Sequence, residues 1–173
     1  MKRIILTGAP GAGKTVLIRE LERLGYPVVE EAATDVIALE QARGNLRPHE
    51  QPQFIETITQ LQLRRVKNAT AGPVQFHDRS VFCTAALAEF LGHPIPPLLE
   101  QAMVEAGGLF ERRVVFVRLL GFVEKTAARQ IGLEESIRFE AVHESVYKRY
   151  GFELDFVQAA DIDTRIRAVL AFI

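Results

Sequence analysis

The segment Gly8-Ala9-Pro10-Gly11-Ala12-Gly13-Lys14-Thr15 follows directly on a short apolar run, Ile4-Ile5-Leu6, and matches the pattern G-x-x-x-x-G-K-[ST] in full. Glycines let the backbone turn tightly enough for its N–H groups and a helix N-terminus to point at phosphate oxygens. The lysine and the hydroxyl then reach the terminal phosphates and magnesium. Apolar residues recur on one helical face over residues 16–24, so the loop joins a strand to a helix. The sequence therefore predicts a nucleoside triphosphate site.

We expect the whole loop and the residue after it to contact the nucleotide: Gly8, Ala9, Pro10, Gly11, Ala12, Gly13, Lys14, Thr15 and Val16. Within this set, Lys14 is expected to act catalytically on the β- and γ-phosphates and Thr15 to bind Mg²⁺. No Asn-Lys-x-Asp motif for guanine recognition occurs, which argues against an ordinary GTPase switch. ATP is the expected nucleotide, with GTP as the alternative.

Length and composition limit the other possibilities. A chain of 173 residues is expected to form a single domain, residues 1–173. The net charge of −1 provides no overall positive field, so no nucleic-acid partner is expected. Cys83 is the only cysteine, which excludes an internal disulfide and is typical of a reducing cytosol. Because no apolar run approaches about 18 residues, we expect a cytoplasmic protein without a membrane partner.

Alternating apolar runs and helical patterns predict an α/β fold. Strands are expected at 4–6, 27–29, 74–77, 114–117 and 152–156. Helices are expected at 16–24, 32–43, 54–69, 81–91, 98–106, 139–150 and 162–173. Such alternation is typical of a five-stranded parallel sheet with right-handed crossovers and helices on both faces, a three-layer α/β/α arrangement. Ligands bind such sheets at the carboxyl ends of the strands.

Two charged motifs besides the loop follow predicted strands, and we expect all three to meet in one cleft. Asp78 could hold magnesium directly or through water, and the alternative is a strand-end cap. Arg79 occupies the position where ATP-hydrolysing motors commonly place a water-orienting glutamate. An arginine there suits an acceptor or a transferred phosphoryl group, whereas a surface salt bridge is the alternative.

The pair Glu30-Glu31 follows the second predicted strand. Glu31 could accept the proton of an acceptor hydroxyl as a general base, and Glu30 is its competitor for that role. Neighbouring side chains project differently, so at most one should face the ligand, and both could instead be solvated first-turn residues. By contrast, His77 is expected to be packed or hydrogen-bonded inside the fold, and Cys83 to be a small buried apolar residue.

Residues 120–135 carry charges with little apolar periodicity, which predicts a mobile lid extending to about residue 139. Arg129 and Arg138 lie within or beside this segment. Closure would add their positive charge over the phosphates and exclude water, which limits wasteful hydrolysis. The alternative for each arginine is an exposed charged surface.

Four elements together carry a family resemblance: the phosphate loop, Glu30-Glu31-Ala32-Ala33, His77-Asp78-Arg79-Ser80 and residues 138–144. On them the chain resembles small bacterial P-loop proteins labelled AAA-domain ATPases or predicted ATPases. That family is similar to the nicotinamide riboside kinase domain and, more distantly, to nucleoside and nucleotide kinases. The resemblance implies that Glu31 is a catalytic base and that Asp78-Arg79-Ser80 is a D-R-[SGY] element. Related sequences often read E-A-A-R, where this chain has Thr34 in place of the arginine.

These observations predict an enzyme that transfers the γ-phosphoryl group of ATP to a small molecule, with Mg²⁺ as cofactor. The acceptor is a hydroxyl or a phosphate, on a nucleoside-like or another small molecule that the sequence does not name. The alternative is a nucleotide-dependent ATPase or GTPase switch with slow hydrolysis, or a regulatory module that binds nucleotide.

Overall fold

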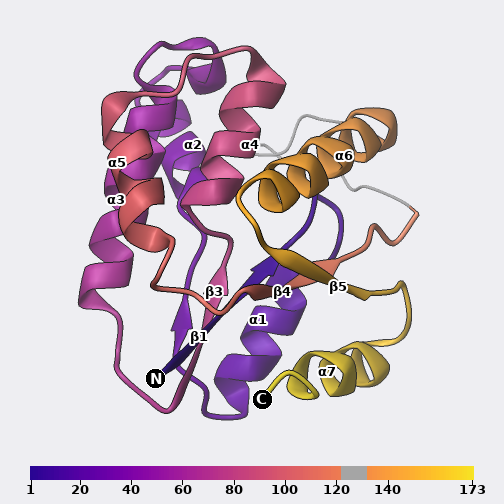
Figure 1. The fold of residues 1–173 in the computed structure, drawn as a ribbon. Helices are drawn as coiled ribbons and strands as arrows, with labels where there is room; N and C mark the ends of the chain where they lie inside the picture. The colour runs from indigo at the N-terminus through magenta and orange to yellow at the C-terminus, as the bar shows by residue number, and fades with distance from the viewer. Residues whose placement is uncertain (122–131) are drawn as a thin grey trace.

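The computed structural model describes residues 1–121 and 132–173 and has three layers (Figure 1). The middle layer is a sheet with strands in the order β2-β3-β1-β4-β5, all of whose pairs are parallel. The strands are β1 (Lys2–Thr7), β2 (Val28–Val29), β3 (Val74–Asp78), β4 (Arg113–Val117) and β5 (Glu153–Val157). The predicted α/β fold with a five-stranded parallel sheet is confirmed.

Helices cover both faces of the sheet (Figure 1). One face carries α1 (Lys14–Arg23) and α7 (Ile162–Leu170). The other face carries α2 (Ala33–Ala42), α3 (Phe54–Asn68), α4 (Val81–Leu91), α5 (Pro97–Ala106) and α6 (Leu133–Arg149). A short 3₁₀ turn, η1 (Pro48–Glu50), connects α2 to α3.

The sheet separates two apolar cores, because successive strand residues point to opposite faces. In β1, Ile4 and Leu6 pack with α1 and α7, whereas Ile5 packs with the helices of the opposite layer. In β4, Val115 lies in the core with α1 and α7, and Val114 lies in the core of the opposite layer. Burial on both faces explains why these strands read as continuous apolar runs in the sequence.

Helix α6 begins at Leu133, six residues before the apolar face at Phe139 that marked it in the sequence. Its first turn exposes Leu133, and the Glu135 carboxylate accepts a hydrogen bond from the Gly132 amide at 3.1 Å. The apolar pattern is weak over the first turns of α6, so the sequence did not indicate where the helix begins. The contact between Gly132 and Glu135 caps the helix at its start. Part of the expected lid is thus helical, while residues 122–131, including Arg129, lie outside the described residues. Movement of the lid stays a prediction.

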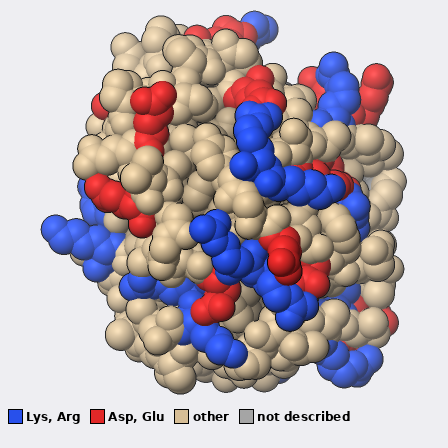
Figure 2. All heavy atoms as spheres, viewed as in Figure 1, with Lys and Arg blue, Asp and Glu red and all other residues tan. Residues whose placement is uncertain are grey.

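The surface mixes both charge signs. On the face shown in Figure 2, Lys and Arg lie among Asp and Glu. Exposed ion pairs of the protein include Arg19–Glu22, Arg23–Glu20 and Arg149–Glu89. Among the described residues, no helix is long and apolar enough to cross a membrane.

Candidate active site

The phosphate loop, residues 8–15, follows β1, and its last two residues are the first two of α1. Gly8, Gly11 and Gly13 have φ values of 137°, 92° and 74°, which side chains rarely tolerate. A Cβ on Gly8 would lie 2.2 Å from the carbonyl oxygen of Val117 in the neighbouring β4. The glycines are therefore required both by the turn and by the close approach of the loop to the sheet.

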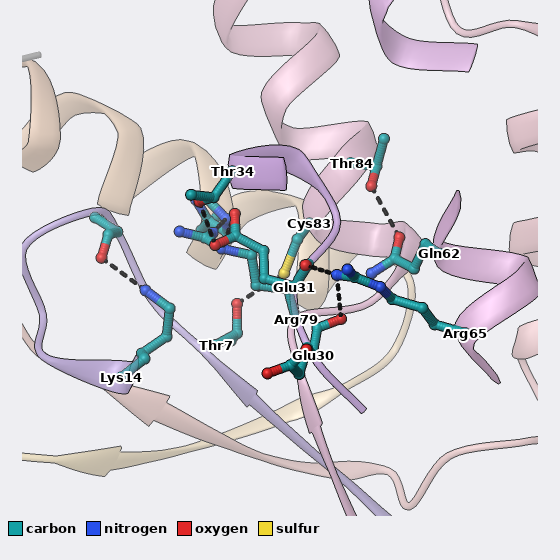
Figure 3. Close-up of polar contacts among 12 residues, drawn as sticks. Thr7, Lys14, Glu30, Glu31, Thr34, Gln62, Arg65, Arg79, Cys83 and Thr84 are labelled. Carbon is teal, nitrogen blue, oxygen red and sulfur yellow. Dashed lines mark hydrogen bonds and ion pairs between the residues drawn. The ribbon is translucent and has the colours of Figure 1, made fainter. Parts of the chain in front are cut away.

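Lys14 is buried at the start of α1, and its Nζ donates a hydrogen bond to the carbonyl oxygen of Ala9 at 2.9 Å (Figure 3). Burial, together with the positive charge of Arg79, lowers the pKa of Lys14 to about 7, against the opposing effect of Asp78 and Glu31. A phosphate bound in the loop would favour the charged ammonium, so nucleotide binding and protonation of Lys14 are coupled.

Asp78 ends β3 and is only 6% exposed. Its Oδ1 is buried and has no hydrogen-bond partner among the described residues. Burial raises the pKa of Asp78 to about 6, against the opposing charge of Lys14. Thr15 lines the same cavity as Asp78. A buried carboxylate oxygen and a hydroxyl that line one cavity fit Mg²⁺, which is usually held by one or two protein oxygens, substrate phosphates and water.

Arg79 follows Asp78 and has a φ of 71°, the only positive φ of a non-glycine residue in the described part of the chain. Its amide donates to the carbonyl oxygen of Leu6 at 2.9 Å, which fixes this turn against β1. The Nε atom lies 3.2 Å from Oε1 of Glu31, with side chains 11% and 22% exposed. Backbone strain of this kind concentrates at functional sites.

The two adjacent glutamates after β2 take different directions. Glu31 lines the cavity and pairs with Arg79, while its Oε2 accepts a hydrogen bond from Thr34 Oγ1 at 2.9 Å (Figure 3). Glu30 is exposed and forms an ion pair with Arg19 at 2.6 Å. Of the two candidates that the sequence left open, Glu31 is the one that lines this cavity.

A single cavity of about 470 Å³ connects these groups. At one end it is lined by the phosphate loop, Thr15 and Asp78. Its other end is apolar and is lined by Ile37, Leu46, Phe54, Ile58, Leu87, Phe90, Leu91 and Phe139. The Glu31–Arg79 pair lines the same cavity, so a phosphate site and an apolar site share one space with a carboxylate and a guanidinium.

Sequence reasoning missed the polar side chains of the apolar end. Gln62 on α3 and Thr84 on α4 are both buried in the cavity wall, and Thr84 Oγ1 donates to Gln62 Oε1 at 3.0 Å (Figure 3). Thr84 lies in a largely apolar helix, whereas Gln62 lies on the buried face of a helix that also carries many polar residues. The signal that could have identified them is a polar residue on a buried face, because such a residue needs a partner.

Cys83 is buried as expected, but its sulfur also has polar neighbours. Its Sγ lies 2.9 Å from Thr7 Oγ1 and 3.0 Å from the Tyr147 hydroxyl, which also contacts Ser80 Oγ at 2.7 Å. These contacts connect β1, α4 and α6 next to Thr7, the residue that directly precedes the phosphate loop. His77 is packed inside the fold as predicted, with Nε2 at 2.8 Å from Gln75 Oε1 and its ring against Phe110.

The structure does not bring every predicted site residue together. Arg138 is exposed on α6, one residue before the buried Phe139, and does not line the cavity. Arg129 lies outside the described residues, so its role stays a prediction. Of the loop, Pro10, Gly11, Gly13, Lys14, Thr15 and Val16 line the cavity, whereas Ala9 and Ala12 are buried behind it.

The phosphate loop and the parallel sheet covered by helices on both faces define a P-loop protein. The chain belongs to the family described as an AAA domain, whose model matches residues 3–165. No curated protein matches the chain in sequence.

Solved structures of deoxyadenosine kinase from M. mycoides share the fold. The structure with the products dCMP and a flexible dCDP is 17% identical with a TM-score of 0.66, covering 98% of this chain and 97% of that chain. Those with dCTP and dATP are 19% and 18% identical, both with a TM-score of 0.64, covering 99% of this chain and 98% of each of those chains. The predicted resemblance to P-loop kinases is confirmed.

Proposed function

We propose that this protein is a small-molecule kinase that transfers the γ-phosphoryl group of ATP to a nucleoside-like acceptor. The observation that carries the proposal is the shared cavity, in which the phosphate loop and an apolar end meet around Glu31 and Arg79. A protein that only hydrolyses nucleotide needs no apolar cavity beside the terminal phosphate. Such a space suits the body of an acceptor and keeps water away from the reacting atoms.

Each polar group then has a role in the transfer. Lys14 and the loop amides hold the β- and γ-phosphates. The acceptor hydroxyl oxygen attacks the γ-phosphorus, the bond to the β–γ bridging oxygen breaks, and the hydroxyl proton passes to a Glu31 carboxylate oxygen. Arg79, which is held beside Glu31, stabilises the negative charge of the transferred group.

Thr15 and Asp78 are the residues that would hold Mg²⁺, which neutralises phosphate charge when bound. The partnerless Oδ1 of Asp78 supports this assignment. In the apolar end, Oε1 of Gln62 accepts a hydrogen bond from Thr84, and both residues line the cavity, so a bound acceptor would meet the NH₂ donors of the Gln62 amide. That amide offers hydrogen bonds to the polar edge of a ring whose faces contact apolar side chains.

A metabolite screen that follows ATP consumption and new phosphorylated products tests the proposal. With the right acceptor, the parent should form a phosphorylated product, and Glu31→Gln should slow that step by about 10²- to 10⁴-fold, the usual contribution of a general base. Glu30→Gln is the matched control, because Glu30 is exposed and pairs with Arg19. It should behave like the parent.

ATP turnover in the absence of an acceptor provides a second test. Without an acceptor, ATP turnover should be slow, because no glutamate follows Asp78 to orient water. Rapid hydrolysis that no metabolite accelerates would instead identify a nucleotide-dependent ATPase or switch.

A further inference from the structure

Arg65 lies on α3 and contacts the backbone of both glutamates that follow β2 (Figure 3). Its Nη1 donates hydrogen bonds to the carbonyl oxygen of Glu31 and, at 3.4 Å, to that of Glu30. Its Nη2 forms an ion pair with Oδ2 of Asp35, which lies in the first turn of α2. One guanidinium thus joins α3 both to the segment that leaves β2 and to the start of α2.

The segment between β2 and α2 is short of regular backbone contacts. Strand β2 lies at the edge of the sheet, and its last pair with β3 is formed by Val29. Helix α2 begins at Ala33, and the preceding Ala32 provides no side-chain cap. The carbonyl group of Glu31 lies between these two elements, where a backbone acceptor needs a donor from elsewhere in the fold. Arg65 supplies that donor.

Glu31 is therefore held at both ends. Arg79 pairs with its Oε1 and Thr34 donates a hydrogen bond to its Oε2, whereas Arg65 holds its carbonyl oxygen. Arg79 and Thr34 line the cavity, so a bound substrate competes for them, but Arg65 does not line it. The contact of Arg65 with the backbone of Glu31 is thus the one that a substrate leaves in place.

We propose that Arg65 is a positioning residue for Glu31, whose backbone it fixes so that the carboxylate reaches the acceptor hydroxyl. The inference rests on the proposed function, because it assigns Arg65 to the proton transfer made by Glu31. A general base acts only within hydrogen-bond reach of the proton, about 2.6–3.2 Å. A displacement of about 1 Å can therefore cost about 10²-fold in rate. The planar fork of a guanidinium serves a carbonyl and a carboxylate at once, which a single ammonium does less well.

A double-mutant cycle separates this role from general support of the fold. Arg65→Met should lower kcat for acceptor phosphorylation by about 10- to 100-fold and leave KM for ATP within about twofold, because Arg65 contacts neither substrate. In Glu31→Gln, which already lacks the base, adding Arg65→Met should lower kcat by less than about threefold. Arg64→Met is the matched control, because Arg64 is the exposed neighbour on the same helix, and it should leave kcat unchanged in both backgrounds.

Equal losses of kcat in the two backgrounds would mean that Arg65 only supports the fold, and an unchanged kcat in Arg65→Met would also overturn the proposal. If Arg65→Met does not fold, Arg65→Lys provides the test, since it keeps the charge but not the fork. A loss of kcat confined to the parent background would support the proposal, and equal losses in both backgrounds would contradict it.

A second measurement needs no acceptor and so separates failure of this inference from failure of the proposed function. The Nε–H resonance of Arg79 reports the Glu31 carboxylate, whose Oε1 lies 3.2 Å from Nε. In Arg65→Met this resonance should move toward its position in Glu31→Gln, and a resonance that stays at the parent position would contradict the role of Arg65. If the resonance moves but the parent phosphorylates no acceptor, Arg65 positions Glu31 as inferred, and the proposed function is overturned.

Discussion

Arg79 and His143 meet at 3.1 Å between Nη1 and Nε2, which joins the end of β3 to α6. Arginine can only donate, so the Nε2 of His143 accepts, and the imidazole is neutral with its proton on Nδ1. That Nδ1–H donates to the carbonyl oxygen of Phe139 at 3.0 Å. A buried, neutral histidine thus orients the guanidinium that pairs with Glu31.

Replacing Arg79 tests whether its backbone is strained. The φ of 71° costs a residue with a Cβ about 1–2 kcal/mol, and glycine avoids this cost. Arg79→Gly and Arg79→Ala both remove the ion pair with Glu31. We therefore expect Arg79→Gly to exceed Arg79→Ala in unfolding free energy by about 1–2 kcal/mol in urea titrations. Equal stabilities would mean that the turn relaxes to a negative φ.

Acid should destabilise the fold partly through His143. Burial, followed by the positive charges of Arg79 and Lys14, lowers the pKa of His143 well below its usual 6.5. As pH falls below 6.5, the unfolded chain gains a proton that the folded chain does not, so this stability is present above 6.5 and is lost toward acid pH. In His143→Gln, the pH dependence of the unfolding free energy should weaken by up to about 1.4 kcal/mol per pH unit.

His77 provides the comparison for that experiment. Burial, with Arg3 as the second cause, lowers the pKa of His77 to about 3, and this contribution is present in both parent and His143→Gln. The difference between the two profiles therefore reports His143 alone. Identical profiles below pH 6.5 would show that His143 is not kept neutral by burial.

Gly8→Ala should be severely destabilising. The added Cβ would lie 2.2 Å from a carbonyl oxygen of the β4 backbone, which cannot rotate away as a side chain could. We expect a loss of about 3 kcal/mol or more in unfolding free energy. Gly25→Ala is the matched control: its φ is also positive, at 90°, but no atom of the described residues lies within 4 Å of the added Cβ. In Gly25→Ala, backbone strain alone should lower the unfolding free energy by about 1–2 kcal/mol. The additional loss in Gly8→Ala then measures the clash.

Lys14→Ala should abolish the Mg·ATP-dependent rise in melting temperature while leaving the folded state intact. The parent should gain stability in proportion to its affinity for the ligand, and removal of the ammonium leaves the terminal phosphates without their main cation. Lys148→Ala is the control, because Lys148 is exposed and pairs only with Glu144 among the described residues. Equal stabilisation of Lys14→Ala and the parent would remove Lys14 from the site.

The sequence by itself determined the phosphate loop, the order of strands and helices, and the edge of the sheet where the charged motifs lie. These features depend on short-range rules: glycines permit positive φ, and continuous apolar runs form strands buried on both faces. The start of α6 escaped this reasoning, because its first turn exposes Leu133 and is set by the contact between Gly132 and Glu135.

Only the tertiary structure decided which side chains meet. Glu30 and Glu31 are equivalent in the sequence, and the pairing of Glu31 with Arg79 depends on how β2 and β3 lie side by side. The contact of Arg165 with Ala12 spans most of the chain and follows from the packing of α7 on α1. Crossover connections determine such contacts, because they bring together residues whose local sequences carry no information about each other.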